Sequence, residues 1–142
     1  METPAEPGIS ATAAQLFVAD VAASCDFFTK ILGFELVFLY GAPPFYGRVR
    51  RGAGNLNLKR MDAAVIDPAL RDRETLLSAD LSVDDSESLT RLFREFQAAG
   101  APFHQGLRRE PWGALTFIVK DPDGNLLLFA APAPQAIVEC VR

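Results

Sequence analysis

Side chains that could do acid–base or metal chemistry are few in this chain. It contains one histidine, His104, and two cysteines, Cys25 and Cys140. Two thiols and one imidazole cannot complete a Cys₂His₂ zinc site, and the chain has no CxxC pair. His104 is a candidate general base, although a single histidine is more often a hydrogen-bonded structural residue. We expect both cysteines to be unpaired thiols in a reducing compartment.

Polar side chains alternate with apolar ones in several short segments. Leu56 and Leu58, for example, alternate with Asn55, Asn57 and Lys59. Alternate residues of a strand point to opposite faces of its sheet, so the apolar set is expected to pack on a helix and the mixed set to line a partly wet concavity. Polar groups on a sheltered face indicate a ligand site, because burying one without a partner costs about 1–3 kcal/mol; the alternative is a solvated sheet face. The polar or mixed-face candidates for ligand contact are Gln15, Phe17, Asn57, Lys59, Ser78 and Asp80.

Arginine and aromatic side chains supply the other candidates. Arg48 and Arg50 share a predicted strand face with Tyr46, and paired guanidinium groups can hold a carboxylate or phosphate. Trp112 is the only tryptophan, and its indole offers a stacking face for a flat ligand. The plainer alternatives are a solvated arginine face and core or interface aromatics. The predicted aromatic wall comprises Phe17, Phe38, Phe45, Tyr46 and Trp112, and Lys59 and Asp80 are a hypothetical ion pair beside it.

Composition limits the class of protein. The chain has 142 residues, 49% of them hydrophobic, and a net charge of −4. This is enough for one domain with its own core, without disulfides or a structural metal. The acidic balance and the lack of a basic stripe argue against nucleic-acid binding. No uncharged apolar run is long enough to cross a membrane, and residues 1–10 do not resemble a signal peptide, so we expect a cytoplasmic protein without membrane contact.

One pattern of elements occurs twice along the chain. In each copy a short apolar strand ends at an aspartate, Asp20 or Asp85, which is followed by a helical stripe, a glycine and three more strands. Asp85 is well suited to cap the second helix. The mixed-charge segment from Asp62 to Glu74 connects the two copies. The predicted strands are 13–18, 34–40, 45–51, 55–60, 76–83, 102–108, 114–120 and 125–130.

Two phrases of the sequence carry a family resemblance. FVADVAASCDFFTKILGFE (17–35) and PWGALTFIVKDPDGNLLLFA (111–130) resemble the two signatures of the vicinal oxygen chelate superfamily, which holds glyoxalase I, extradiol dioxygenases, fosfomycin-inactivating enzymes and bleomycin resistance proteins. The resemblance implies an α+β fold of two tandem βαβββ modules that form a cupped mixed sheet, usually in a homodimer. We therefore expect a flexible N-terminus (1–10), a single domain (11–131; module one 11–61, connector 62–75, module two 76–131) and a C-terminal tail (132–142).

The same resemblance places the metal-ligand positions of the family on four residues of this chain. They are Ala13, Ser78, Leu128 and, in the least secure part of the alignment, a position near Asn57. None of the four is a strong metal ligand, since divalent ions need imidazoles, thiolates or several oxygens. This implies no metal cofactor and resembles the bleomycin resistance branch, which often carries a Pro-Trp-Gly segment like Pro111-Trp112-Gly113.

These patterns predict a homodimeric protein that binds a small aromatic or antibiotic-like ligand without metal or other cofactor. The basic residues Arg48, Arg50, Arg51 and Lys59 favour a neutral or anionic ligand, so bleomycin itself is not specified. Three alternatives stay open. The first is a metal-dependent lyase, dioxygenase or thiol transferase; the second is a metal-free enzyme that uses Asp80, His104 or Arg48; the third is a regulatory domain with an empty cup.

Overall fold

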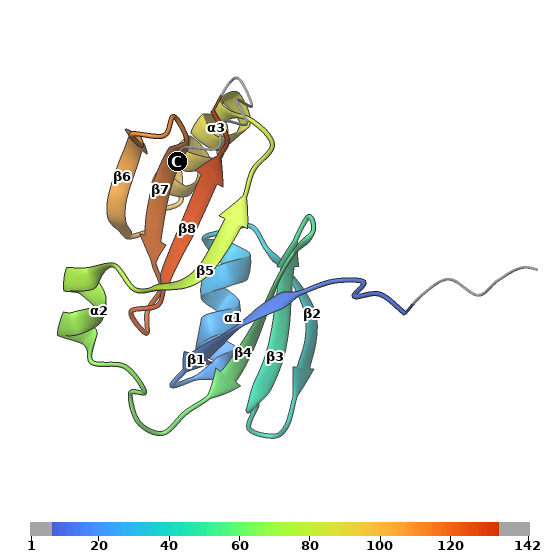
Figure 1. The fold of residues 1–142 in the computed structure, drawn as a ribbon. Coiled ribbons are helices and arrows are strands. Elements are labelled where there is room, and N and C mark those ends of the chain that lie inside the picture. Colours follow the sequence, from blue (N-terminus) through green and yellow to red (C-terminus); the bar gives the residue numbers. More distant parts are fainter. Residues whose placement is uncertain (1–6, 134–142) are drawn as a thin grey trace, which may run out of the picture.

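A computed structural model describes residues 7–133 of the chain (Figure 1). Most of the expected flexible N-terminus, nearly all of the C-terminal tail and Cys140 lie outside the described residues. Two βαβββ modules follow one another, joined by a segment that contains a short helix. No helix in the range 7–133 is long and apolar enough to cross a membrane. The elements are β1 (Ala13–Val18), α1 (Val21–Lys30), β2 (Glu35–Tyr40), β3 (Tyr46–Arg51), β4 (Gly54–Arg60), α2 (Pro68–Glu74), β5 (Leu77–Ser82), α3 (Ser86–Ala98), β6 (Phe103–Arg109), β7 (Leu115–Lys120) and β8 (Leu126–Ala131).

Each module forms its own four-stranded mixed sheet. The strand orders are β1-β4-β3-β2 and β5-β8-β7-β6, with one parallel pair in each sheet, β1 with β4 and β5 with β8. The predicted α+β fold of two tandem modules is therefore confirmed. Figure 1 shows the two sheets with the edge strands β1 and β5 turned toward each other, and α1 and α3 against the sheets of their own modules.

Both long helices begin at the predicted aspartates. The Asp20 carboxylate accepts a hydrogen bond from the backbone N–H of Ala23 (3.0 Å), and the Asp85 carboxylate accepts one from Ser88 (2.7 Å). A carboxylate at this position satisfies one of the backbone donors left unpaired in the first helical turn. The two caps fix where each helix leaves its preceding strand.

Strand alternation divides buried from open faces as expected in the first module. Leu16, Val18, Leu56 and Leu58 are at most 1% exposed and pack on the α1 side of the sheet. In β5 the alternation is broken, because a bulge between Leu77 and Ala79 leaves Leu77 43% exposed instead of packed on the helix side. One continuous core runs through both modules. In the second module, phenylalanine rings pack edge to face, tilted or stacked on one another: Phe93, Phe96, Phe103, Phe117 and Phe129.

The DPDGN turn of the second module holds the end of β1 in the first. Asn125 donates from Nδ2 to the Phe17 carbonyl (3.2 Å), and the Ala19 backbone N–H donates to the Asp123 carboxylate (2.8 Å). The buried Asp121 carboxylate accepts hydrogen bonds from the backbone N–H groups of Asp123 (2.9 Å) and Asn125 (2.7 Å). This turn therefore has a structural role, since it joins the two modules at the point where β1 ends.

Candidate ligand-binding face

The side of the first sheet that faces away from α1 carries the largest group of predicted site residues. Residues paired across neighbouring strands share a face, and the register gives three rows across β1, β4, β3 and β2. We call this surface the open face. Its rows are Phe17–Lys59–Tyr46–Tyr40, Gln15–Asn57–Arg48–Phe38 and Ala13–Asn55–Arg50–Glu35.

Arg48 lies in the middle row of the open face and is held by both lateral neighbours. Its Nε donates a hydrogen bond to Asn57 Oδ1 (2.7 Å), and its guanidinium carbon lies 5.7 Å from the centre of the Phe38 ring. The Phe38 ring in turn packs against Tyr46, with 5.6 Å between ring centres. Across residues 7–133 no carboxylate forms an ion pair with Arg48, so its terminal nitrogens keep their donors for a ligand.

The neighbouring charges make the open face basic. Arg50 is already engaged, because it donates two hydrogen bonds to one Glu35 carboxylate oxygen (2.9 and 3.1 Å). That ion pair is exposed and contributes little to stability. Lys59 is exposed at the end of β4 and forms no ion pair with any described residue, Asp80 included, so the hypothetical Lys59–Asp80 pair is not formed. After the Arg50–Glu35 pair is counted, Arg48 and Lys59 leave a net positive charge on the open face.

Aromatic side chains border Arg48 and Lys59. Phe17 and Phe38 are each 37% exposed, and Tyr40 is 65% exposed. Phe45 precedes β3 and is 50% exposed, and its ring packs edge to face on Tyr40. Exposed aromatic rings beside an unpaired guanidinium suit a flat ligand that carries a negative charge.

The candidates of the second module do not join this group. The Ser78 hydroxyl donates to Asn125 Oδ1 (3.2 Å), which ties it to the DPDGN turn. Trp112 is 72% exposed in the turn between β6 and β7 and shares no strand with the open face. His104 lies on β6 and acts electrostatically on Asp72, whose pKa is lowered mainly by a hydrogen bond from Lys120. The candidate general base His104 therefore does not lie on the open face with Arg48.

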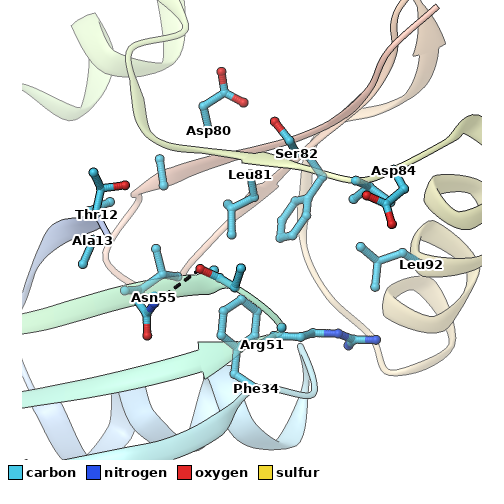
Figure 2. Close-up of a pocket in the computed structure, with 18 of the residues that line it drawn as sticks. Thr12, Ala13, Phe34, Arg51, Asn55, Asp80, Leu81, Ser82, Asp84 and Leu92 are labelled. Atoms are coloured by element: carbon cyan, nitrogen blue, oxygen red, sulfur yellow. Dashed lines mark hydrogen bonds between the residues drawn. The ribbon is translucent and has the colours of Figure 1, made fainter. Parts of the chain in front are cut away.

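Asp80 lines a separate groove between the two modules (Figure 2). The groove has a volume of about 900 Å³. It is bounded by β5 and α3 on one side and by the start of β1 and the β3–β4 hairpin on the other. In Figure 2 the Asp80 carboxylate points away from Asn55 on the opposite wall. The groove reaches the open face at Ala13 and Asn55, so the two surfaces are continuous.

The residues at the family's metal-ligand positions do not fit a divalent ion. Ala13 and Leu128 have no donor atoms, Ser78 is bonded to Asn125, and the Asn57 oxygen accepts from the Arg48 guanidinium. Between residues 7 and 133, no group of three or more His, Cys, Asp or Glu side chains is placed to hold a metal. A cation beside Asn57 would also lie next to the positive charge of Arg48.

Comparison with known proteins places the chain in a family. The model of the Glyoxalase/Bleomycin resistance protein/Dioxygenase superfamily matches residues 9–129. The chain belongs to this superfamily. A search of curated proteins finds no match.

Solved structures of the superfamily share the fold. A glyoxalase/bleomycin resistance protein/dioxygenase from Alicyclobacillus acidocaldarius is 20% identical, with a TM-score of 0.69 over 87% of this chain and 91% of that one. The bleomycin-binding protein of Streptomyces verticillus, solved with copper(II)-bleomycin, is 25% identical, with a TM-score of 0.65 over 91% and 99%. A lactoylglutathione lyase from Agrobacterium tumefaciens is 19% identical, with a TM-score of 0.65 over 88% and 96%. The family and fold are thus established, and a bleomycin-binding protein and a lactoylglutathione lyase share the fold.

Glu35 and Tyr40 lie on the open face but were absent from the predicted site. Both lie on β2, where a bulge between Leu36 and Phe38 shifts the register. Simple alternation along the strand predicts that Glu35 and Phe38 lie on opposite faces of the sheet. The bulge shifts the alternation by one residue, so both side chains lie on the open face. The opposite charges of Glu35 and Arg50 were the available signal for their pairing.

Proposed function

We propose that the protein binds a flat aromatic or antibiotic-like small molecule that carries a negative charge, without a protein-held metal. The ligand lies on the open face, with its anionic group on Arg48 and its ring against Phe38 and Tyr46. The observation that carries this proposal is the Arg48 guanidinium, which is positioned by Asn57 and Phe38 but lacks a carboxylate partner among residues 7–133. Such a preorganised donor loses little conformational freedom when a ligand binds.

The superfamily relatives support ligand binding as the general activity. The Streptomyces verticillus relative is a bleomycin-binding protein, and its structure contains copper(II)-bleomycin. Bleomycin-type drugs are cationic, whereas Arg48 and Lys59 make the open face of this chain basic. We therefore propose that the ligand of this chain differs in charge from bleomycin.

We further propose that the protein is a homodimer. All residues of the edge strand β2 are exposed, and five of them in a row are large and apolar: Leu36, Val37, Phe38, Leu39 and Tyr40. An unpaired, apolar sheet edge favours association with another chain. A second copy that covers β2 would also close one side of the open face and shield the ligand from water.

We propose a cytoplasmic location, for which the buried free thiol of Cys25 gives modest support. Burial raises the pKa of this thiol, which keeps it protonated and unreactive. Fractionation of the native host would contradict the proposal if the protein were recovered from an oxidising compartment.

Thermal shift with two matched probes tests the ligand proposal. Naphthalene-2-carboxylate is expected to raise the melting temperature, and naphthalene-2-carboxamide, which has the same ring without the charge, is expected to do so far less. Arg48→Met is expected to weaken carboxylate binding about 10- to 100-fold, because a charge-assisted hydrogen bond contributes about 1.5–3 kcal/mol. Copper(II)-bleomycin is expected to bind more weakly than the carboxylate.

The control variant is Arg94→Met, which removes an exposed arginine of α3 that has no hydrogen-bond or ion-pair partner in the described chain. It is expected to bind the carboxylate like the wild type. Equal affinity for the acid and the amide, or equal weakening by both arginine substitutions, would show that Arg48 does not recognise the ligand.

A further inference from the structure

A second arginine, Arg71, is buried without an ion-pair partner in the described chain, although its charge helps to lower the pKa of Asp72. It lies in α2 and is only 6% exposed. No carboxylate of residues 7–133 forms an ion pair with it. Its Nη1 makes two long hydrogen bonds, to the Asp123 carbonyl (3.4 Å) and to Asn125 Oδ1 (3.5 Å). Its Nε is buried and has no hydrogen-bond partner within the described residues.

This arrangement is energetically expensive in the free protein. Burying a charged group without a paired counter-charge costs far more than two long hydrogen bonds to neutral oxygens return. Arginine does not escape the cost by losing its proton, because a guanidinium group stays protonated in proteins. The Nε and Nη2 side of the guanidinium is the edge that carboxylates bind with two parallel hydrogen bonds, and no described residue forms a hydrogen bond with it. An external anion is the partner that this side chain lacks.

A small cavity lies beside Arg71. Its volume is about 200 Å³, and it is a half-open pocket bordered by the end of β1, the segment before α2 and the DPDGN turn. Its lining surface is divided about equally between polar and apolar atoms, and the two carboxylates at its boundary are those of Asp62 and Asp123. The apolar residues of its walls are Phe17, Val18, Ala19, Met61, Ala63, Ala64, Val65, Ile66 and Pro68.

The charge and shape of this cavity select one class of anion. Asp62 and Asp123 repel a dianion such as phosphate more strongly than a monoanion. The apolar part of the walls favours a ligand with a hydrocarbon part, and the cavity holds only a few carbon atoms. From these observations we infer that the Arg71 cavity binds a small monocarboxylate with a short branched apolar tail. This site meets the open face only at Phe17, and the inference does not depend on the proposed function.

Thermal shift with 3-methylbutanoate tests the inference. At saturation this acid is expected to raise the melting temperature of the wild type by about 5–10 °C, while 3-methylbutanamide and sodium chloride at equal ionic strength leave it nearly unchanged. Arg71→Met is expected to abolish the response and to keep or raise the melting temperature without ligand, since it removes an unpaired buried charge. Arg73→Met is the matched control, because Arg73 lies on the same helix but is exposed, and it is expected to respond like the wild type.

Arg71→Lys and side-chain NMR decide the result if the methionine variant fails to fold. The lysine variant keeps the charge but cannot form two parallel hydrogen bonds with a carboxylate. Its affinity for 3-methylbutanoate is therefore expected to be at least tenfold lower than that of the wild type. In the wild type, the Nε–H resonance of Arg71 is expected to shift on addition of 3-methylbutanoate and not of the amide. An unresponsive wild type, an equal response to the amide, or a full response in Arg71→Met would overturn the inference.

Discussion

Asp121 is the side chain whose protonation bears most directly on how the modules are joined. It is 3% exposed, and it accepts hydrogen bonds from Asn125 Nδ2 (2.9 Å) and from two backbone N–H groups of the DPDGN turn. Burial raises the pKa of Asp121 from 3.8 to about 6, although these hydrogen bonds act in the opposite direction. The ionised carboxylate is therefore held in place at an energetic cost.

This pKa predicts how stability depends on pH. The folded protein binds the Asp121 proton more tightly than the unfolded chain, so the contribution of this group is fully present below about pH 4 and is lost as pH rises through about 6. A shift of about two pKa units corresponds to about 3 kcal/mol. Urea denaturation at several pH values between 4 and 7 gives the free energy of unfolding of the wild type and of Asp121→Asn. The contribution of Asp121 is the difference between the two proteins in how that free energy changes with pH. Parallel pH profiles of the two proteins would contradict the raised pKa.

Residue types and spacing predicted the open face better than they predicted the whole site. The residues Gln15, Asn57, Lys59, Tyr46 and Arg48 gather there because strand alternation fixes which side chains share a face. Alternation does not predict how the sheets of the two modules are arranged in space. The predicted site therefore also included Ser78, Asp80 and Trp112, which belong to the second module. Their role in ligand binding remains a prediction, and in the proposed homodimer it would require a partner chain that brings the second module over the open face.

At the scale of elements, the helix caps carry a measurable share of stability. Asp85 caps α3 with a 2.7 Å hydrogen bond to the Ser88 N–H, and this bond is the main reason why the pKa of Asp85 is lowered. Asp85→Ala is expected to lower the free energy of unfolding by about 1 kcal/mol. Chemical denaturation measures this, with Asp84→Ala as the control, since Asp84 is exposed and caps nothing. Equal losses in both variants would mean that the cap itself contributes nothing.

The sequence predicted all eight strands and the two long helices but not α2. The periodic patterns of α1 and α3 and the repeated order of elements were strong signals. In the connector, the Asp67 carboxylate accepts a hydrogen bond from the Ala69 N–H, and Pro68 occupies the first turn of α2. An aspartate followed by a proline is a common start of a helix. That signal was present in the sequence, but seven residues give too few turns for a periodic pattern. The bulges in β2 and β5 were not predictable, because they depend on pairing with a neighbouring strand.

For the whole molecule, contacts between the modules favour one folding unit. Arg51 of β3 forms an ion pair with Glu95 of α3, and Asn125 of the DPDGN turn donates a hydrogen bond to the Phe17 carbonyl at the end of β1. One core cluster includes residues of both sheets. These contacts support the proposal that residues 11–131 form a single domain.

The exposed apolar edge strand β2 predicts a dimer that a charged side chain introduced into β2 would dissociate. Val37→Lys is expected to convert a dimer into a monomer at micromolar concentration, since a charged side chain opposes strand-edge association. Light scattering after gel filtration measures the mass, with Leu76→Lys, an exposed apolar residue outside the sheet edge, as the control. A wild-type monomer, or a dimer unaffected by Val37→Lys, would exclude this edge as the interface.

Ligand binding without a protein-held metal is the central claim, and calorimetric titration in the presence of a chelator tests it most directly. Wild-type protein treated with excess EDTA is expected to bind naphthalene-2-carboxylate with the affinity that it has in untreated buffer, because Arg48, Phe38 and Tyr46 supply the contacts. Addition of Zn²⁺, Ni²⁺ or Mn²⁺ is expected to change nothing. Loss of binding in EDTA that one of these ions restores would contradict the account.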